Sequence, residues 1–465
     1  MTTLGRISAD CPACSACRLG SSSERNVDRA KEKHRKPLRL ATSVLVAGVA
    51  IFAGGCGGRD TSGTQHPRLV YWPAANPREV ELARKLVAEW NRLHPDVPVD
   101  MQPVPESQST EEVLLTAIAG RTTPDVCSNI WPGAVAQFAR AKGLVPLESF
   151  ADFDSLVRAR LPHGLIESYR QVDGHVYEIP WKINPVLLEY NVTMFREAGY
   201  ERPPATYQEF LEAGKRITKD RDGDGVIDQW LMLVDFRVKW WLRFFDFYAF
   251  YLAASRGGLL VEDRQVLFEN RAAVEVFRFF QQGFALGVFP RSTFQVDAFL
   301  LGKVASHTTG PWNIEHVERY KPPGFEYDYA PIPVPDSSCL PPVTYGDPKN
   351  IAIFTTTRWP KQAWEFVKFL VSPEADLLLL ELCSQLPVRK DLMRDSLYAG
   401  YFVSHPKMIA FAEAAGRTQG PGSVPELKEI FDAISHEFES CCFYAHKTPE
   451  QAVHAAAERA REILR

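Results

Sequence analysis

Apolar and polar residues change period several times between residues 69 and 141, and these changes predict alternating strands and helices. The run LVYW at 69–72 is apolar throughout and predicts a short buried strand. A helix is expected next, because Asn76 is a favoured cap, Pro77 suits the first turn and Glu79 stands at the third helical position. One face of that helix is apolar, with Leu82, Ala83, Leu86, Val87 and Trp90.

The same alternation continues after this helix. Residues 97–104 alternate toward a second strand, residues 123–126 lead into a third strand, and residues 134–141 predict another helix. Strands that alternate with helices are typical of α/β layers around a largely parallel sheet. We therefore expect an α/β protein.

The chain begins with features of an export signal. Residues 40–52 are uncharged and largely apolar, follow a basic stretch at 34–39, and lead through small residues at 53–55 to Cys56. As a helix these residues would reach about 20 Å, short of the ~30 Å that spans a bilayer. The cysteine after small residues resembles a bacterial lipoprotein cleavage box, although Ala53 stands where leucine is preferred. We expect lipidation at Cys56; an uncleaved anchor and a signal cut elsewhere are the alternatives.

Length and charge narrow the classes of protein. Beyond the leader and signal at 1–55 and a Gly/Ser/Thr-rich tether at 56–67, residues 68–465 are long enough for two lobes of about 200 residues each. The whole chain is 45% hydrophobic and 24% charged, as in globular proteins. After the first 55 residues, acidic groups outnumber basic ones by nine. This charge offers no electrostatic case for binding nucleic acid.

The cysteines predict neither a metal centre nor a disulfide framework. Cys11, Cys14 and Cys17 lie upstream of the signal and would be lost on cleavage. Later in the chain five cysteines remain, an odd number that leaves at least one thiol free. They are Cys127, Cys339, Cys383, Cys441 and Cys442.

Five segments resemble one protein family when they are taken in order. They are GHVYEIP at 174–180 with LEYN at 188–191, FLLGKVA at 299–305, GPW at 310–312, AWEF at 363–366, and LPVRK at 386–390. Each is weak alone, but together over about 68–450 they resemble the type-1 extracellular solute-binding proteins. That family includes the maltose and multiple-sugar binding proteins of ABC importers. Ser306 stands where methionine is usual.

The resemblance implies a type II periplasmic-binding-protein fold, with two α/β lobes joined by hinge strands and a ligand cleft between them. Lobe 1 would hold about 68–180 and part of 330–390, and lobe 2 about 185–325 and the C-terminal helices. The chain would cross between lobes near 179–191, 329–333 and 343–353. Ligands of such proteins bind beyond the carboxyl ends of the strands, and the lobes close by a hinge motion.

The implied function is capture of a sugar, an oligosaccharide or related polyol, outside the cytoplasm and delivery to an ABC transporter permease. The protein would be a monomer, anchored to the membrane by lipid, with no catalytic residues and no required cofactor. A carbohydrate-active enzyme would need two carboxylates about 5–10 Å apart, and no spacing motif singles out such a pair. A ligand sensor with the same fold is a further alternative that the sequence does not separate from transport.

A sugar site needs flat aromatic surfaces and planar polar side chains. The resemblance places Trp312 where it would stack on sugar, and Trp72, Asn76, Asn129, Trp131 and Asn184 near the cleft lining. Weaker candidates from the same segments are Trp181, Lys182, Trp240, Trp241, Tyr345 and Asp347. Asn184 stands where maltose-type proteins carry a carboxylate, which argues against maltose itself. Lys182 could pair with an anionic ligand; pairing with Glu178 or Glu189 at the rim is the favoured interpretation.

One local motif predicts a cation site. In DRDGDGVID at 220–228, the acids Asp220, Asp222, Asp224 and Asp228 and a glycine at position 6 fit an EF-type calcium loop. Position 12 is Leu231 instead of the bidentate glutamate. A structural calcium ion is one interpretation, and a Gly/Asp-rich surface turn held by side-chain-to-backbone bonds is the other.

Overall fold

The computed structural model describes residues 66–105, 109–422 and 424–465. These residues all belong to one compact unit. The predicted signal at 40–52, the predicted lipidation site Cys56, the early cysteines and most of the tether lie outside the described residues.

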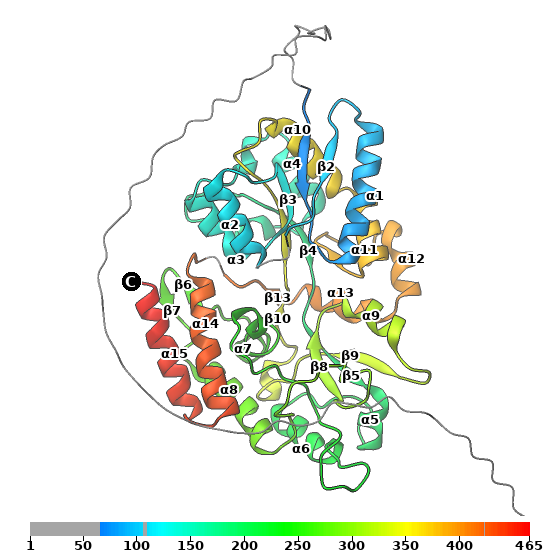
Figure 1. Cartoon of the computed structure of the whole chain (residues 1–465), viewed down its shortest axis with the longest axis vertical. Helices are drawn as coiled ribbons and strands as arrows, with labels where there is room; N and C mark the ends of the chain where they lie inside the picture. Colours follow the sequence, from blue (N-terminus) through cyan, green and yellow to red (C-terminus); the bar gives the residue numbers. More distant parts are fainter. Residues whose placement is uncertain (1–65, 106–108, 423) are drawn as a thin grey trace, which may run out of the picture. The chain divides into compact units, whose positions relative to one another are not determined.

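Six strands form the sheet of the first lobe, in the order β12-β4-β11-β3-β1-β2 (Figure 1). Their bounds are β1 (Leu69–Trp72), β2 (Val99–Met101), β3 (Val126–Ile130), β4 (Ile179–Ile183), β11 (Lys349–Ile353) and β12 (Leu386–Pro387). The prediction of a largely parallel sheet holds for β1, β2 and β3. It is wrong for β11 and β12, which pair antiparallel. The chain enters β11 from the opposite end because it returns there from the second lobe.

Helices cover both faces of this sheet. One face packs against α1 (Pro77–Leu93), α10 (Pro360–Leu370) and α11 (Pro373–Cys383), and the other against α2 (Thr110–Gly120) and α3 (Pro132–Arg140). Successive β11 side chains alternate between the two cores: Ile351 and Ile353 join the first, Ala352 the second. The lobe is completed by η1 (Leu147–Ser149), α4 (Phe153–Arg160) and η2 (Leu165–Tyr169).

The second lobe is built on a smaller, antiparallel sheet with the order β8-β5-β9. Its strands are β5 (Leu187–Asn191), β8 (Ser306–Thr309) and β9 (Tyr327–Ala330), and short pairs are made by β6 (Val261–Glu262) with β7 (Gln265–Val266) and β10 (Thr344–Tyr345) with β13 (Thr418–Gln419). Its helices are α5 (Val192–Glu197), α6 (Tyr207–Ile217), η3 (Trp240–Phe244), α7 (Phe247–Ser255), α8 (Arg271–Ala285), α9 (Asn313–Tyr320), η4 (Ser337–Cys339), α14 (Leu427–Phe438), η5 (Glu439–Phe443) and α15 (Pro449–Ile463).

The chain passes between the two sheets at two short connections, from β4 to β5 and from β10 to β11. The predicted crossing at 329–333 is wrong. Tyr329 lies in β9, and Val334 then pairs with Thr206, so this segment stays in the second lobe. Farther along, α12 (Ser396–Ser404) packs on α11 of the first lobe and α13 (Lys407–Ala415) on β9 of the second.

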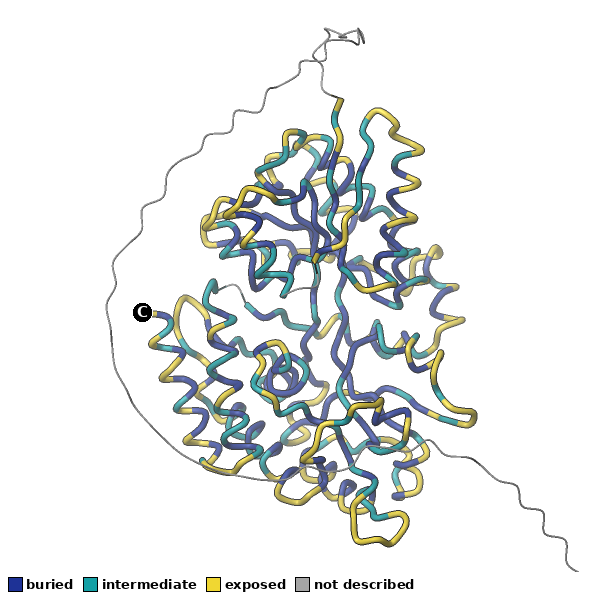
Figure 2. Tube along the Cα trace, viewed as in Figure 1, coloured by how far each residue is buried: buried dark blue, intermediate teal, exposed yellow. Residues whose placement is uncertain are grey.

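Buried residues concentrate in the strands of both sheets and in α7 (Figure 2). All five cysteines of the described part are buried and carry free thiols. Among the described residues, none of the helices has the length and apolar character that a bilayer crossing requires.

Candidate solute-binding site

A cavity of about 610 Å³ lies between the two lobes. Its first-lobe wall comes from the turn between β1 and α1, the end of β3, the end of β4, and the segments around β11 and β12. Its second-lobe wall comes from α9 and the residue before it. Strands β1 and β3 therefore point their carboxyl ends at the cavity, where ligands of α/β sheets usually bind.

The start of α1 is held in place by its own cap. The Asn76 side chain accepts a hydrogen bond from the backbone N–H of Glu79 at 3.0 Å, and its amide donates to Oε1 of Glu79 at 2.9 Å. Pro77 occupies the first helical position, where a missing N–H costs nothing. This cap, which the sequence predicts, presents Arg78 and Glu79 to the cavity wall.

A buried ion pair joins α1 to β4 at the same wall. Nζ of Lys182 lies 2.5 Å from Oε1 of Glu79, and the two side chains are 2% and 5% exposed. Burial raises the pKa of Glu79, but the Lys182 charge and three hydrogen bonds outweigh burial and hold that pKa below its ordinary value. Gln385 supplies one of these bonds, at 3.1 Å.

The prediction that Lys182 pairs with Glu178 or Glu189 is thus wrong, because its partner is Glu79. Glu178 accepts a hydrogen bond from Asn350, and burial raises its pKa to about 8. Glu189 is fully buried and accepts hydrogen bonds from Asn313 and Tyr329. The charge of Lys182 is compensated within the first lobe.

Trp312 lies on the second-lobe side of the cavity, as the N-cap residue of α9. Its ring packs over Gly310, where a Cβ atom would come within 2.0 Å of the ring. Phe245 supports the ring edge-on, with 6.0 Å between centroids. The glycine and the phenylalanine together fix the orientation of the indole.

One ion pair connects the two lobes across the cavity. Nε of Arg78 in α1 donates to Oε2 of Glu315 in α9 at 2.6 Å, and Nη2 of Arg78 contacts the other carboxylate oxygen. The two side chains are 35% and 32% exposed. A two-pronged guanidinium–carboxylate contact fixes geometry as well as charge.

Six of the predicted candidate residues line this cavity: Asn76, Asn129, Lys182, Asn184, Trp312 and Asp347. Asn184 also ties the two connections together. Its N–H donates to the carbonyl of Gly346 at 2.5 Å, and its side-chain oxygen accepts from the N–H of Leu386 at 3.3 Å. Contact of these six residues with a ligand stays a prediction.

The other predicted aromatic residues lie away from the cavity wall. Trp131, Trp240 and Tyr345 are at most 6% exposed and share one core, where Trp131 of the first lobe lies 5.4 Å from Trp240 of the second, between centroids. The hydroxyl of Tyr345 donates a hydrogen bond to Oδ1 of Asp347 at 3.3 Å, so Tyr345 contacts a residue of the cavity wall without lining the cavity itself. Trp72 is half-buried with no partner for its indole N–H among the described residues.

The weaker candidates outside the wall differ in exposure. Trp241 is 44% exposed, and Nζ of Lys239 lies over its ring. Trp181 is buried beside Lys182 in β4.

Sequence reasoning missed several residues of the wall. The sequence marks Glu79 only as part of a helix start, and it gives no signal of a site role for Arg78, Glu315, Lys349 and Gln385. The only local hint was an acid at the third position of a helix that directly follows a strand. The partners of these residues lie up to 306 positions away along the chain, so no local pattern could find them.

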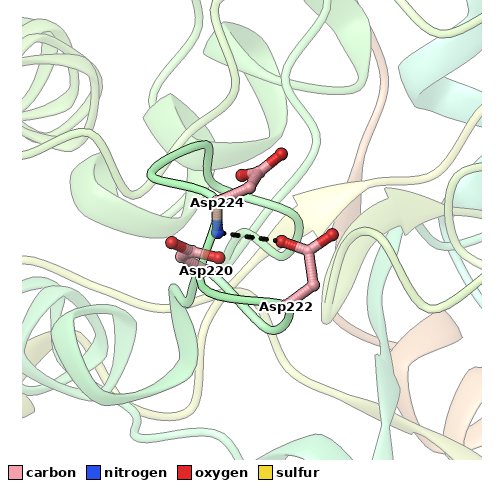
Figure 3. A group of neighbouring side chains, drawn as sticks. All are labelled: Asp220, Asp222 and Asp224. Atoms are coloured by element: carbon pink, nitrogen blue, oxygen red, sulfur yellow. Dashed lines mark hydrogen bonds between the residues drawn. The ribbon is translucent and has the colours of Figure 1, made fainter.

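The acidic loop brings three of its four predicted ligands together. Carboxylate oxygens of Asp220, Asp222 and Asp224 all lie within 4.8 Å of one another (Figure 3). Backbone N–H groups of Gly225 and Gly223 bond to Asp220 and lower its pKa. Asp228 is outside the cluster, and its carboxylate accepts from the backbone N–H of Arg221.

Calcium binding at this loop stays a prediction. With Leu231 at position 12, we expect weak binding, and 10 mM calcium should stabilise the protein by roughly 1–3 kcal/mol in thermal unfolding. Asp222→Asn should abolish the shift. An unchanged melting temperature, with no heat of binding in calorimetry, would contradict the prediction.

Comparisons with known proteins agree with this architecture. Residues 74–376 match the family described as bacterial extracellular solute-binding protein. The maltotriose-binding protein of Pyrococcus abyssi is 25% identical over 79% of this chain and 76% of its own length. The sn-glycerol-3-phosphate-binding periplasmic protein UgpB of Escherichia coli O6:K15:H31 is 23% identical over 92% of this chain and 98% of its own length.

A solved structure supports the same fold. The sugar-binding protein MalE of Xanthomonas citri superposes with a TM-score of 0.69 at 24% identity, over 85% of this chain and 97% of that one. Two α/β lobes around a cavity define a protein that holds a ligand between its lobes. The chain belongs to the bacterial extracellular solute-binding proteins, a family that binds solutes and does not transform them.

Proposed function

We propose that this protein binds a neutral carbohydrate, an oligosaccharide or related polyol, and delivers it to the membrane permease of an ABC importer. The observation that carries the proposal is the chemistry of the cavity wall. Asparagine and glutamine amides lie beside one tryptophan, and the charged side chains Glu79, Lys182 and Arg78 are paired with protein groups. Amides and an aromatic face suit the hydroxyls and C–H faces of a sugar.

The relatives narrow the choice of ligand. One relative is named for maltotriose and another for sn-glycerol 3-phosphate. The second ligand is an anion, and an anion is bound best by unpaired cationic groups. The lysines and arginines of the wall each lie within 4.0 Å of a carboxylate: Lys182 of Glu79, Arg78 and Arg319 of Glu315, and Lys349 of Asp347. We therefore favour the uncharged ligand.

Isothermal titration calorimetry tests this proposal on the purified protein without its first 55 residues. Maltotriose, other neutral oligosaccharides and polyols, and sn-glycerol 3-phosphate would be titrated under the same conditions. We expect at least one neutral ligand to bind with micromolar or better affinity. Binding of sn-glycerol 3-phosphate alone, or turnover of any sugar, would overturn the proposal.

The proposal includes a lipid anchor at Cys56. Cys56→Ala should move the protein from the membrane fraction to the soluble extracytoplasmic fraction, whereas Cys14→Ala should leave it on the membrane. Membrane retention of the Cys56→Ala variant would contradict the anchor and leave the ligand proposal standing.

The ion pair between Arg78 and Glu315 should favour approach of the two lobes. Because both side chains are about one-third exposed, we expect a modest effect, roughly 0.5–1 kcal/mol. Glu315→Gln should raise the radius of gyration of the unliganded protein in X-ray scattering and speed ligand release several-fold. Arg78→Gln should change both values in the same direction. Unchanged values in both variants would refute the role.

A further inference from the structure

The two carboxylate oxygens of Glu79 have unequal environments. Oε1 accepts from the Asn76 amide at 2.9 Å and the Gln385 amide at 3.1 Å, and it lies 2.5 Å from Nζ of Lys182. Oε2 of the same carboxylate is buried and has no hydrogen-bond partner among the described residues. The residue is 4% exposed and borders the cavity.

The side chain of Gln385 also has one polar atom with a partner and one without. Its amide N–H donates to Glu79, while its carbonyl oxygen is buried with no partner in the described part of the chain. It is 6% exposed and also borders the cavity. Two hydrogen-bonded residues at one wall therefore each carry an unsatisfied acceptor.

Buried polar groups without partners are rare and destabilise the folded protein, most of all when they are charged. A carboxylate accepts several hydrogen bonds, and an amide oxygen accepts two. Both atoms can accept and neither can donate. A ligand that contacts the wall through these two atoms has to supply the donors.

The net charge of the Glu79–Lys182 pair limits which hydrogen-bond donors suit this wall. Lys182 neutralises Glu79, so the wall does not call for a cation. A phosphate monoester carries nearly two negative charges at neutral pH and would place its oxygens against a carboxylate oxygen. Hydroxyl groups donate without adding charge.

We propose that Glu79 and Gln385 form a hydroxyl-accepting subsite that makes the cavity select a neutral polyhydroxyl solute over a phosphorylated one. The inference rests on the proposed function and adds the residues that discriminate. Lys182 acts by holding the carboxylate in its charged form. The discrimination separates this chain from a relative named for sn-glycerol 3-phosphate, although that relative is similar along 92% of the chain.

The test compares variants that keep the wall neutral. Gln385→Leu removes one acceptor, and the double variant Glu79→Met with Lys182→Met removes the other without stranding a buried charge. Gln282→Leu, an exposed position of α8, is the matched control. Maltotriose and sn-glycerol 3-phosphate are the two probes in calorimetry, and thermal unfolding shows that each variant is folded.

We expect the wild-type protein and Gln282→Leu to bind maltotriose with equal affinity and to give no heat with sn-glycerol 3-phosphate. Gln385→Leu and the double variant should each lose about tenfold or more in maltotriose affinity, the loss of one well-placed hydrogen bond. Wild-type affinity in both folded variants would overturn the subsite and leave the proposed function intact. Tighter binding of sn-glycerol 3-phosphate than of maltotriose by the wild-type protein would overturn the selectivity.

Absence of binding to every neutral ligand in the broader titration would instead overturn the proposed function itself. The two failures are thus distinguishable, because the first is seen only in the variants and the second already in the wild-type protein.

Discussion

Trp312→Ala should weaken sugar binding by roughly 2–4 kcal/mol while the protein stays folded. The reason is that Trp312 is the only tryptophan among the described residues of the cavity wall, and its indole offers a large apolar face to the ligand. The ring is half-buried at the start of α9, held by Gly310 beneath and Phe245 at the edge. It therefore meets a ligand with little loss of conformational entropy. Calorimetry with the bound oligosaccharide measures the loss.

Two further variants make this experiment specific. Gly310→Ala should reproduce part of the loss, because a Cβ atom there would lie 2.0 Å from the ring and displace it. Trp359→Ala removes another half-buried tryptophan that caps a helix, α10, outside the cavity, and it should bind normally. Normal binding by Trp312→Ala would show that the site is wrongly assigned even though the family is right.

Asp376→Asn should lower the free energy of unfolding by about 3–5 kcal/mol without changing the ligand affinity of the folded protein. The Asp376 side chain is fully buried and paired with Arg160 and Arg389, which are 2% and 11% exposed. Arg160 also donates to the carbonyls of Val371 and Trp181, so this cluster joins α4, α11 and β4. Burial raises the pKa of Asp376, and the charges of Arg160 and Arg389 oppose that rise. Removing the carboxylate charge leaves the buried guanidinium of Arg160 and the partly buried one of Arg389 without compensation.

Urea unfolding measures this effect, with Glu326→Gln as the control. Glu326 pairs with Arg196 at the surface, where the side chains are 57% and 55% exposed, and such pairs contribute about 1 kcal/mol or less. A loss below about 1 kcal/mol in Asp376→Asn would show that the cluster is not important for stability.

Local features of the fold were predictable from the sequence. The helix start at Asn76 and Pro77 is confirmed, because α1 begins at Pro77 with an Asn76 cap. Caps and apolar periods depend on residues within one or two turns of each other, so a single stretch of sequence contains all the information. The family segments likewise predict the fold class.

The direction of the strands and the points where the chain crosses between lobes were harder to predict from the sequence. Strand β11 pairs with β3 and β4, and β9, which holds Tyr329, pairs with β5. Each pairing depends on where the chain returns after more than a hundred residues. Neither has a local signal in the apolar pattern, because parallel and antiparallel strands bury their faces in the same way.

The residues of the candidate site likewise fall into those that the sequence predicted and those that only the structure revealed. Sequence alone determined that the chain is an α/β solute-binding protein, and it identified Trp312, Asn76 and Asn184 as candidates for a wall that they do line. Only the tertiary structure decided that Lys182 pairs with Glu79, that Gln385 joins them, and that Trp131 and Trp240 pack on each other instead of lining the cavity. The physical reason is range. Periodicity and capping act between neighbours in the chain, whereas ion pairs and aromatic contacts form between residues that only the folding of both lobes brings together.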